Sequence, residues 1–180
     1  MQKQPLCFGY NGSCLLYTSL WKISLEQNQM ALQEQPADQQ LLAQAVIDGE
    51  VQKAEHIEQY SDEELAAITV FGLPGMYAKH LFALQPAKLH LADQKPLLVL
   101  QGGKDRQVTP KNGLEAWEQA LEGHPDATYK LYENLNHIMG DYQGDPVPFL
   151  QLTTVEYMQR TPVPAYVVDD IAAWINAHLA

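Results

Sequence analysis

The clearest hydrophobic pattern in this sequence lies in its second half. Residues 97–100 read Leu-Leu-Val-Leu, an apolar run that follows Pro96 and leads, through one Gln, into the pair Gly102-Gly103. A short continuous apolar run between turn-forming residues is typical of a strand buried on both faces of a parallel sheet. The pattern therefore predicts a strand that begins after Pro96 and ends at the glycine pair.

A second strand and two helices are predicted further along the chain. Apolar and polar residues alternate from residue 127, which indicates a strand over 127–137. Residues 112–123 and 162–179 have helical periodicity, with Gly123 ending the first helix and two prolines near the start of the second. The order strand, helix, strand, helix indicates an α/β fold. We expect the helices to bury Leu114, Trp117, Ala120, Leu121, Tyr166, Ile171, Trp174, Ile175 and Leu179.

The first half of the chain, after about residue 21, is Gln-rich, acidic and helical in pattern. Candidate helices cover residues 25–35, 37–60 and 61–72. Ser61 with Glu64 three residues later fits a capping box, and Pro74-Gly75 predicts a turn that ends this block. The second helix is expected to bury one stripe of apolar residues, namely Leu41, Leu42, Ala45, Val46, Val51, Ala54 and Ile57.

Composition and charge narrow the classes of function. The chain has 180 residues, 46% of them hydrophobic, which is enough for one domain with a substantial core. Its formal net charge of −11 argues against nucleic acid and against an anionic membrane surface, because both bind clusters of Lys and Arg. Apolar stretches are too short or too interrupted to span a bilayer. We expect a soluble, cytoplasmic protein, although Lys3 followed by an apolar-leaning run leaves export open.

The two cysteines, Cys7 and Cys14, carry no recognisable site. No His or Cys stands beside them at the spacing of metal ligands, and two cysteines do not make a disulfide framework. We interpret them as buried or incidental thiols. The isolated histidines are interpreted as surface or packing residues; these are His56, His80, His90, His124 and His178.

An acid and an imidazole follow the two predicted strands. Asp105 comes shortly after the first strand, and His137 comes at the end of the second. In open α/β sheets the loops at the carboxyl ends of the strands carry the functional groups, so these side chains are expected to meet at one edge. A carboxylate that accepts a hydrogen bond from histidine fixes its tautomer, as in hydrolytic triads. Position alone leaves open whether such a pair is catalytic.

The residues around this pair resemble a known family. The string LVLQGGKDRQVTP, an amphipathic segment with Trp117, and then YKLYENLNHIM resemble the C-terminal part of α/β-hydrolase serine esterases. The bacterial group in question is related to the serine aminopeptidase S33 and dienelactone hydrolase families. The resemblance covers residues from about 96 to the final helix and includes Gln101, Gly102, Asp105, Gln107, Val108, Thr109, Leu135, Asn136 and His137.

The resemblance implies a fold, a reaction and two site residues. The fold would be α/β, with residues 95–180 forming the last two strands and flanking helices of an α/β-hydrolase sheet. Residues 21–94 would be a helical cap region, and residues 1–20 an irregular N-terminal segment. Asp105 would be the triad acid and His137 the general base, acting on a small-molecule ester or thioester. No metal or organic cofactor is implied, and Gln107, Asn136 and Tyr142 are expected only to hold the loops.

The nucleophile of such an enzyme is missing from the sequence. α/β-hydrolases place it in Gly-x-Ser-x-Gly on a strand-to-helix turn, upstream of the acid and the base. No such pentapeptide occurs here; Ser13, Ser19 and Cys14 all lack the flanking glycines. The nucleophile is therefore expected from a region outside this chain.

Three interpretations follow from the absence of the Gly-x-Ser-x-Gly turn, which is called the nucleophile elbow. The first is the acid-base half of a truncated hydrolase, inactive alone, which would self-associate through exposed edges or need its N-terminal half. The second is a non-catalytic binding or remnant protein in which Asp105 and His137 are vestigial. The third, a phosphate site on the Gly-Gly-Lys turn, has little support because the spacing of a phosphate loop is absent.

Overall fold

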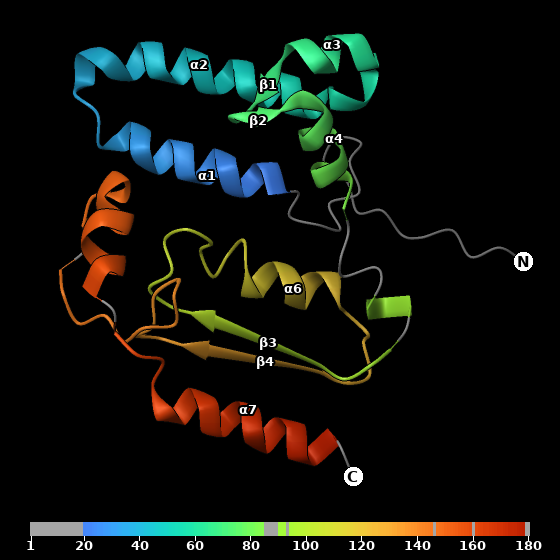
Figure 1. Ribbon diagram of the computed structural model, residues 1–180, viewed down its shortest axis with the longest axis vertical. Helices are drawn as coiled ribbons and strands as arrows, with labels where there is room; N and C mark the ends of the chain where they lie inside the picture. The colour runs from blue at the N-terminus through green and yellow to red at the C-terminus, as the bar shows by residue number, and fades with distance from the viewer. Residues whose placement is uncertain (1–19, 85–89, 93, 146, 160, 179–180) are drawn as a thin grey trace, which may run out of the picture.

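The computed structural model describes residues 20–84, 90–92, 94–145, 147–159 and 161–178 (Figure 1). The first half is helical and contains one small hairpin. Its elements are α1 (Leu20–Gln33), α2 (Ala37–Glu55), the 3-10 turn η1 (Ile57–Gln59), α3 (Asp62–Ala67), β1 (Thr69–Val70), β2 (Leu73–Pro74) and α4 (Gly75–Ala83). The second half contains β3 (Leu97–Gly102), α6 (Leu114–Ala120), β4 (Ala127–Tyr132), the short helical turns η2 (Phe149–Gln151), η3 (Leu152–Glu156) and η4 (Tyr157–Gln159), and α7 (Ala165–His178).

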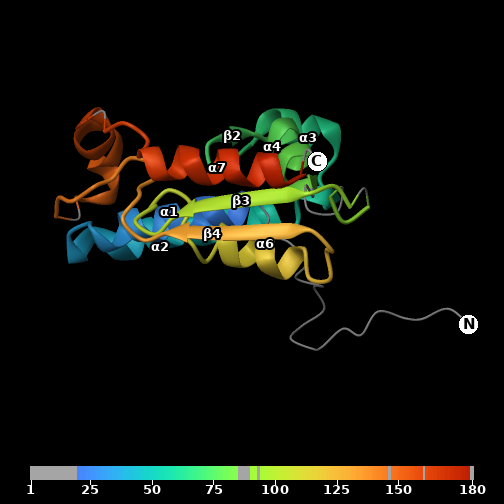
Figure 2. The ribbon, with the colours of Figure 1, turned by 90° about the horizontal axis from the view of Figure 1, so that it is seen from below.

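The second half is a three-layer α/β arrangement, as the sequence predicted. β3 and β4 are parallel, with Leu97 opposite Ala127 and Gly102 opposite Tyr132. Figures 1 and 2 show α6 on one face of this strand pair and α7 on the other. Alternate residues of the strands face opposite helices, as the pleat requires. The cluster under α6 contains Leu91, Leu97, Trp117, Ala120, Leu121, Ala127 and Tyr129, and the cluster under α7 contains Leu100, Tyr132, Leu135, Met139, Val167 and Ile171.

The buried face of α7 differs from the predicted one. Val167 is the residue that α7 buries most deeply, at 1% exposure, and Ile171 packs beside it. Tyr166 and Ile175, predicted to be buried, are 46% and 41% exposed. Because α7 lies across only two strands, it can cover only a narrow strip of apolar surface. Leu179 lies outside the described residues.

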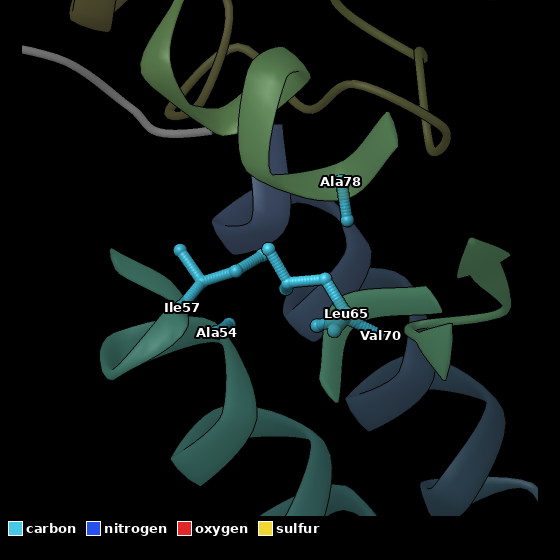
Figure 3. Close-up of a cluster of buried hydrophobic side chains, with 5 residues drawn as sticks. All are labelled: Ala54, Ile57, Leu65, Val70 and Ala78. Carbon is cyan, nitrogen blue, oxygen red and sulfur yellow. The ribbon is translucent and has the colours of Figure 1, made fainter. Parts of the chain in front are cut away.

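The helical half has a hydrophobic core of its own. Figure 3 shows its buried side chains, Ala54, Ile57, Leu65, Val70 and Ala78, converging from α2, η1, α3, β1 and α4. The predicted capping box is confirmed at the start of α3, where Ser61 and Glu64 bond each other's backbone amides. All residues of this core belong to the helical half.

The predicted apolar stripe of α2 is correct only at its C-terminal end. Ala54, together with Ile57 just beyond the helix, is buried, but Leu41, Leu42 and Val46 are 84%, 74% and 59% exposed. The inward face instead runs through Ile47 to Ala54, seven residues or two helical turns apart. The N-terminal part of α2 lies alongside α1 but beyond the core, so its leucines find no partners to bury them (Figure 1).

The helix predicted over residues 61–72 ends early. α3 stops at Ala67, and a hairpin follows in which Thr69 pairs with Pro74. Phe71 and Gly72 both have positive φ, of 49° and 78°, which closes the turn between the two strands. The β-branched residues Ile68, Thr69 and Val70 favour extended backbone, which explains the early end. Pro74 does not end the block, because α4 begins directly after it at Gly75.

Candidate active site

The site is built where β3 and β4 end side by side. The chain after β3 lies against the chain after β4: Gly103 N–H donates to Tyr132 O at 2.8 Å, and Lys104 N–H donates to Leu135 O at 2.9 Å. A Cβ atom on Gly103 would stand 2.8 Å from the Cα of Glu133. The glycine pair was expected to form a turn at the end of the strand. Their evident role is to allow close packing of two backbones, since neither has a positive φ.

This packing brings Asp105 and His137 together. His137 Nδ1 lies 3.0 Å from Asp105 Oδ2, although the residues are 32 positions apart in sequence. The Asp105 side chain is 8% exposed, whereas that of His137 is 38% exposed. A buried acceptor thus holds one ring nitrogen while the ring itself reaches the surface. The proximity expected from the sequence is present, and the catalytic role remains a prediction.

The Asp105 carboxylate is fixed by several donors besides His137. Its Oδ1 accepts the backbone N–H groups of Gln107 and Val108 at 2.9 and 2.8 Å. Its Oδ2 also accepts Gln101 Nε2 at 3.3 Å, and the same amide nitrogen donates to Val108 O at 3.0 Å. Gln101 is buried, so its amide is held in one place between the strand end and the loop. Such bonds stabilise an ionised carboxylate in a buried position.

The loop that carries His137 is shaped by Asn136. Its side-chain Oδ1 accepts the N–H groups of Ile138 and Gly140 at 3.2 and 3.1 Å, and its own N–H donates to Gly140 O at 3.0 Å. Met139 takes a positive φ of 57° inside this turn. Asn136 therefore has the loop-holding role expected of it, and it turns the chain so that His137 faces Asp105.

Electrostatics favour the protonated form of His137. The hydrogen bond to Asp105 raises the pKa of His137 above its usual value of 6.5, and the negative charge of Asp105 adds to this effect. Partial burial of the ring opposes it. Because an ionised carboxylate can only accept, the neutral imidazole carries its proton on Nδ1. Nε2 then has a free lone pair, and no group among the described residues donates to it.

A tyrosine beside His137 and the buried glutamate that precedes it were not foreseen from the sequence. The Tyr157 ring lies with its centroid 6.1 Å from that of His137, and its buried hydroxyl has no partner among the described residues. Burial, followed by the charge of Asp105, raises the pKa of this hydroxyl, so it stays protonated. Glu156 is 3% exposed, with Oε1 also lacking a described partner. No sequence signal marked these residues, because they lie in short helical turns outside the motif.

Two other histidines, His178 and His56, have their partners elsewhere in the fold. His178 Nε2 lies 3.1 Å from Asp126 Oδ1, at the opposite end of β4, and its Nδ1 lies 2.7 Å from Trp174 O. His56 Nδ1 contacts Gln52 O within its own helical end. The His56 contact is local, whereas His178 also links α7 to the residue before β4. Within the described ranges no group of three or more His, Cys, Asp or Glu side chains could hold a metal ion.

The candidates for the nucleophile lie outside the described residues. They are Ser13, Ser19 and Cys14, and Cys7 lies outside these residues as well.

Among the helices that the structure describes, none has the length and apolar character needed to cross a bilayer.

Part of the chain is similar in sequence to a known esterase. The chain is 34% identical over 106 residues to Esterase EstD of Thermotoga maritima. The matched region covers 59% of this chain but 24% of the relative, so the chain spans about a quarter of that protein. No family model matches the chain, and no solved structure does. The similarity supports an esterase relationship for a chain whose strand ends hold a hydrogen-bonded acid and imidazole.

Proposed function

We propose that this chain supplies the acid and the base of an α/β-hydrolase-type serine hydrolase that cleaves carboxylic esters or thioesters. Asp105 is the orienting acid and His137 the general base. The observation that carries the proposal is the 3.0 Å contact between His137 Nδ1 and the buried Asp105 carboxylate, at the ends of neighbouring parallel strands. The similarity to an esterase adds the class of substrate.

The geometry fits the chemical steps of acyl transfer. Asp105 holds the proton on Nδ1, so Nε2 can remove the proton of a serine hydroxyl as its oxygen bonds to the acyl carbon. The imidazolium formed is stabilised by the Asp105 carboxylate, and Nε2 then gives this proton to the departing alcohol or thiol. Water repeats the sequence on the acyl-enzyme: Nε2 takes a proton from water as the water oxygen bonds to the acyl carbon. Nε2 then returns this proton to the departing serine oxygen, and the carboxylic acid is released.

The partner of this pair is a serine on a Gly-x-Ser-x-Gly elbow. The 180 residues contain no such pentapeptide, so the nucleophile is assigned to a segment outside them. In the same proposal residues 95–180 form the C-terminal half of the hydrolase sheet, and residues 21–94 form its cap. The independent core of the helical half, around Leu65 and Val70, is consistent with a separately packed cap.

The test begins with the coding DNA upstream of the Met1 codon, read in all three frames for a strand followed by the elbow. If an elbow is found, the complete protein is assayed with a short-chain 4-nitrophenyl ester beside its His137→Ala variant. The expected result is hydrolysis that His137→Ala abolishes. A variant that keeps a near-normal rate would contradict the assignment of His137.

A second function, a non-catalytic binding or remnant protein, is favoured by one observation, the absent elbow. Here Asp105 and His137 would be vestigial, and the exposed apolar positions of α2 would serve an interaction. Ester turnover separates the two functions. If the complete protein, with any upstream segment included, hydrolyses esters no faster than buffer does, the non-catalytic function is correct.

A further inference from the structure

Helix α1 contacts the loop that carries Asp105, from about eighty residues earlier in the chain. Glu26 Oε2 accepts Thr109 Oγ1 at 2.8 Å and Asn112 Nδ2 at 2.7 Å. The next residue, Gln27, donates from Nε2 to Gln107 O at 2.8 Å. We call residues 105–112 the acid loop. Figure 1 shows this loop rising from the end of β3 toward α1 before it returns to α6.

A single residue, Gln107, links helix α1 to the Asp105 carboxylate. Gln107 gives its carbonyl to Gln27 and its N–H to Asp105 Oδ1, at 2.8 and 2.9 Å. A residue that is bonded at both its N–H and its C=O has little freedom in φ and ψ. The orientation of the Asp105 carboxylate therefore depends on a residue that α1 holds from the other side.

The Glu26 contact is of a strong kind. An ionised carboxylate that accepts two side-chain donors forms charge-assisted hydrogen bonds, which are stronger than neutral ones. Thr109 and Asn112 lie on both sides of Pro110, so the two bonds span the far end of the acid loop. Both Glu26 and Gln27 are partly buried. Water competes less well for such groups than for exposed ones.

Glu34, the residue that follows α1, extends this contact to the segment after the His137 loop. Glu34 Oε1 accepts Phe149 N–H at 2.6 Å and lies 3.4 Å from Arg106 Nη2. α1 itself also packs beside η2. The helix and the residue that follows it thus contact both the acid loop and η2, which precedes the Tyr157 turn.

We propose that Glu26 and Gln27 are positioning residues, which hold the acid loop so that Asp105 faces His137. The inference rests on the proposed function, in which Asp105 orients the base, and it extends that function to the helical half. α1 then helps to fix the position of Asp105, because its side chains bond the loop that carries this residue. A movement of α1 would be transmitted to the Asp105 carboxylate.

The test measures His137 itself and requires no turnover. The Cε1 proton of His137 is followed by NMR against pH in the full chain, assigned with His137→Gln. In the variant E26A/Q27A we expect the pKa of His137 to fall toward 6.5, because a loosened Asp105 no longer holds the imidazolium. Asn28→Ala is the matched control. This exposed residue of α1 donates to Ser24 O of its own helix, and its replacement should leave the titration unchanged.

Two further variants separate positioning from general stability. Glu26→Gln, with Gln27 unchanged, keeps an acceptor oxygen. In this variant His137 should titrate as in the wild type. If the double variant does not fold, Gln27→Ala alone is read by the same titration. A folded Q27A or E26A/Q27A protein in which His137 titrates as in the wild type would overturn the proposal. A shifted titration, together with no ester turnover by the complete protein that includes the upstream segment, would keep the positioning role and reject the proposed function.

Discussion

Gly102 packs against Asn136 so closely that a Cβ atom at residue 102 would stand 2.8 Å from the Asn136 carbonyl oxygen. The same atom would overlap the carbonyl of Leu135. The strand end that leads to the acid is therefore in direct contact with the residue before the base. A side chain cannot enter this space without separating the two loops.

We accordingly expect Gly102→Ala to lower the free energy of unfolding by about 1–3 kcal/mol, the usual cost of an overpacked site. Gly49→Ala is the matched control, because Gly49 lies inside α2 with nothing within 4 Å of its Cβ position. That change should stabilise the chain by about 0.5–1 kcal/mol through helix propensity. Urea unfolding of both variants provides the comparison, and equal effects would show that the crowding at Gly102 is unimportant.

Asp105→Asn should impair the complete enzyme without disrupting the loop. An amide can still accept the N–H groups of Gln107 and Val108 through its oxygen, but it no longer presents a carboxylate to His137. The imidazole loses its fixed tautomer, and we expect kcat to fall on the order of 10⁴-fold. The pKa of His137 should fall at the same time, because its hydrogen bond to Asp105 is what chiefly raises it. A near-normal kcat would contradict the triad assignment.

The stability of the fold should depend on pH through His137. Its pKa is raised in the folded chain above the usual 6.5, so folding favours its protonated form. The stabilisation is complete below pH 6.5 and is lost as the pH rises through the raised folded value. The free energy of unfolding is measured against pH for the wild type and for His137→Gln. The wild-type advantage should shrink with rising pH, and a constant difference would show that the Asp105 contact does not form in solution.

Tyr157→Phe should stabilise the protein or leave its stability unchanged. The hydroxyl of Tyr157 is buried without a described partner, so removing it relieves an uncompensated desolvation cost of about 1 kcal/mol. Tyr142 offers a matched contrast, because its buried hydroxyl donates to Asp145 O at 2.8 Å. Tyr142→Phe should destabilise by about 1 kcal/mol. Thermal unfolding of both variants tests the sign, and a loss of stability in Tyr157→Phe would imply a partner that its hydroxyl meets in solution.

The isolated chain should self-associate. β3 pairs with β4 along one edge, and no described strand pairs with its other edge. Light scattering across a range of concentrations is expected to show a rising mean mass. The variant L41Q/L42Q removes the exposed leucines of α2 and should leave this behaviour unchanged if the strand edge is responsible. A monomer with one sharp unfolding transition would contradict the expectation.

Local pattern predicted the second half of the chain well. The run from Leu97 falls on β3. The alternation from Ala127 falls on β4, but this strand ends at Tyr132 and not at residue 137 as predicted. The parallel pairing of the two strands follows from the helix between them. The proximity of Asp105 and His137 followed from that topology. Sequence could also have marked Gln101, a polar residue that ends an apolar strand.

Contacts between distant segments were not predictable. Leu41 and Leu42 have the composition of buried residues, but only the position of α2 relative to its core decides that they are exposed. Glu26 lies more than eighty residues before Asn112, and no periodicity links the two. The β1–β2 hairpin has two residues in each strand, too few for an alternating pattern. These features depend on tertiary packing rather than on local preference.

The parallel register of β3 and β4 has a consequence for how such a chain can vary. Because Gly102 lies opposite Tyr132, the relative placement of the two loops is fixed by the strand pair itself and not by the length of the crossover through α6. Insertions near His124 and Pro125 at the far end of the strands would leave the acid and the base in place. A single-residue deletion within β3 would instead move Asp105 by about 3.3 Å along the strand and reverse its facing residues. Insertions and deletions are therefore best tolerated at the end of the strand pair that is farthest from Asp105 and His137.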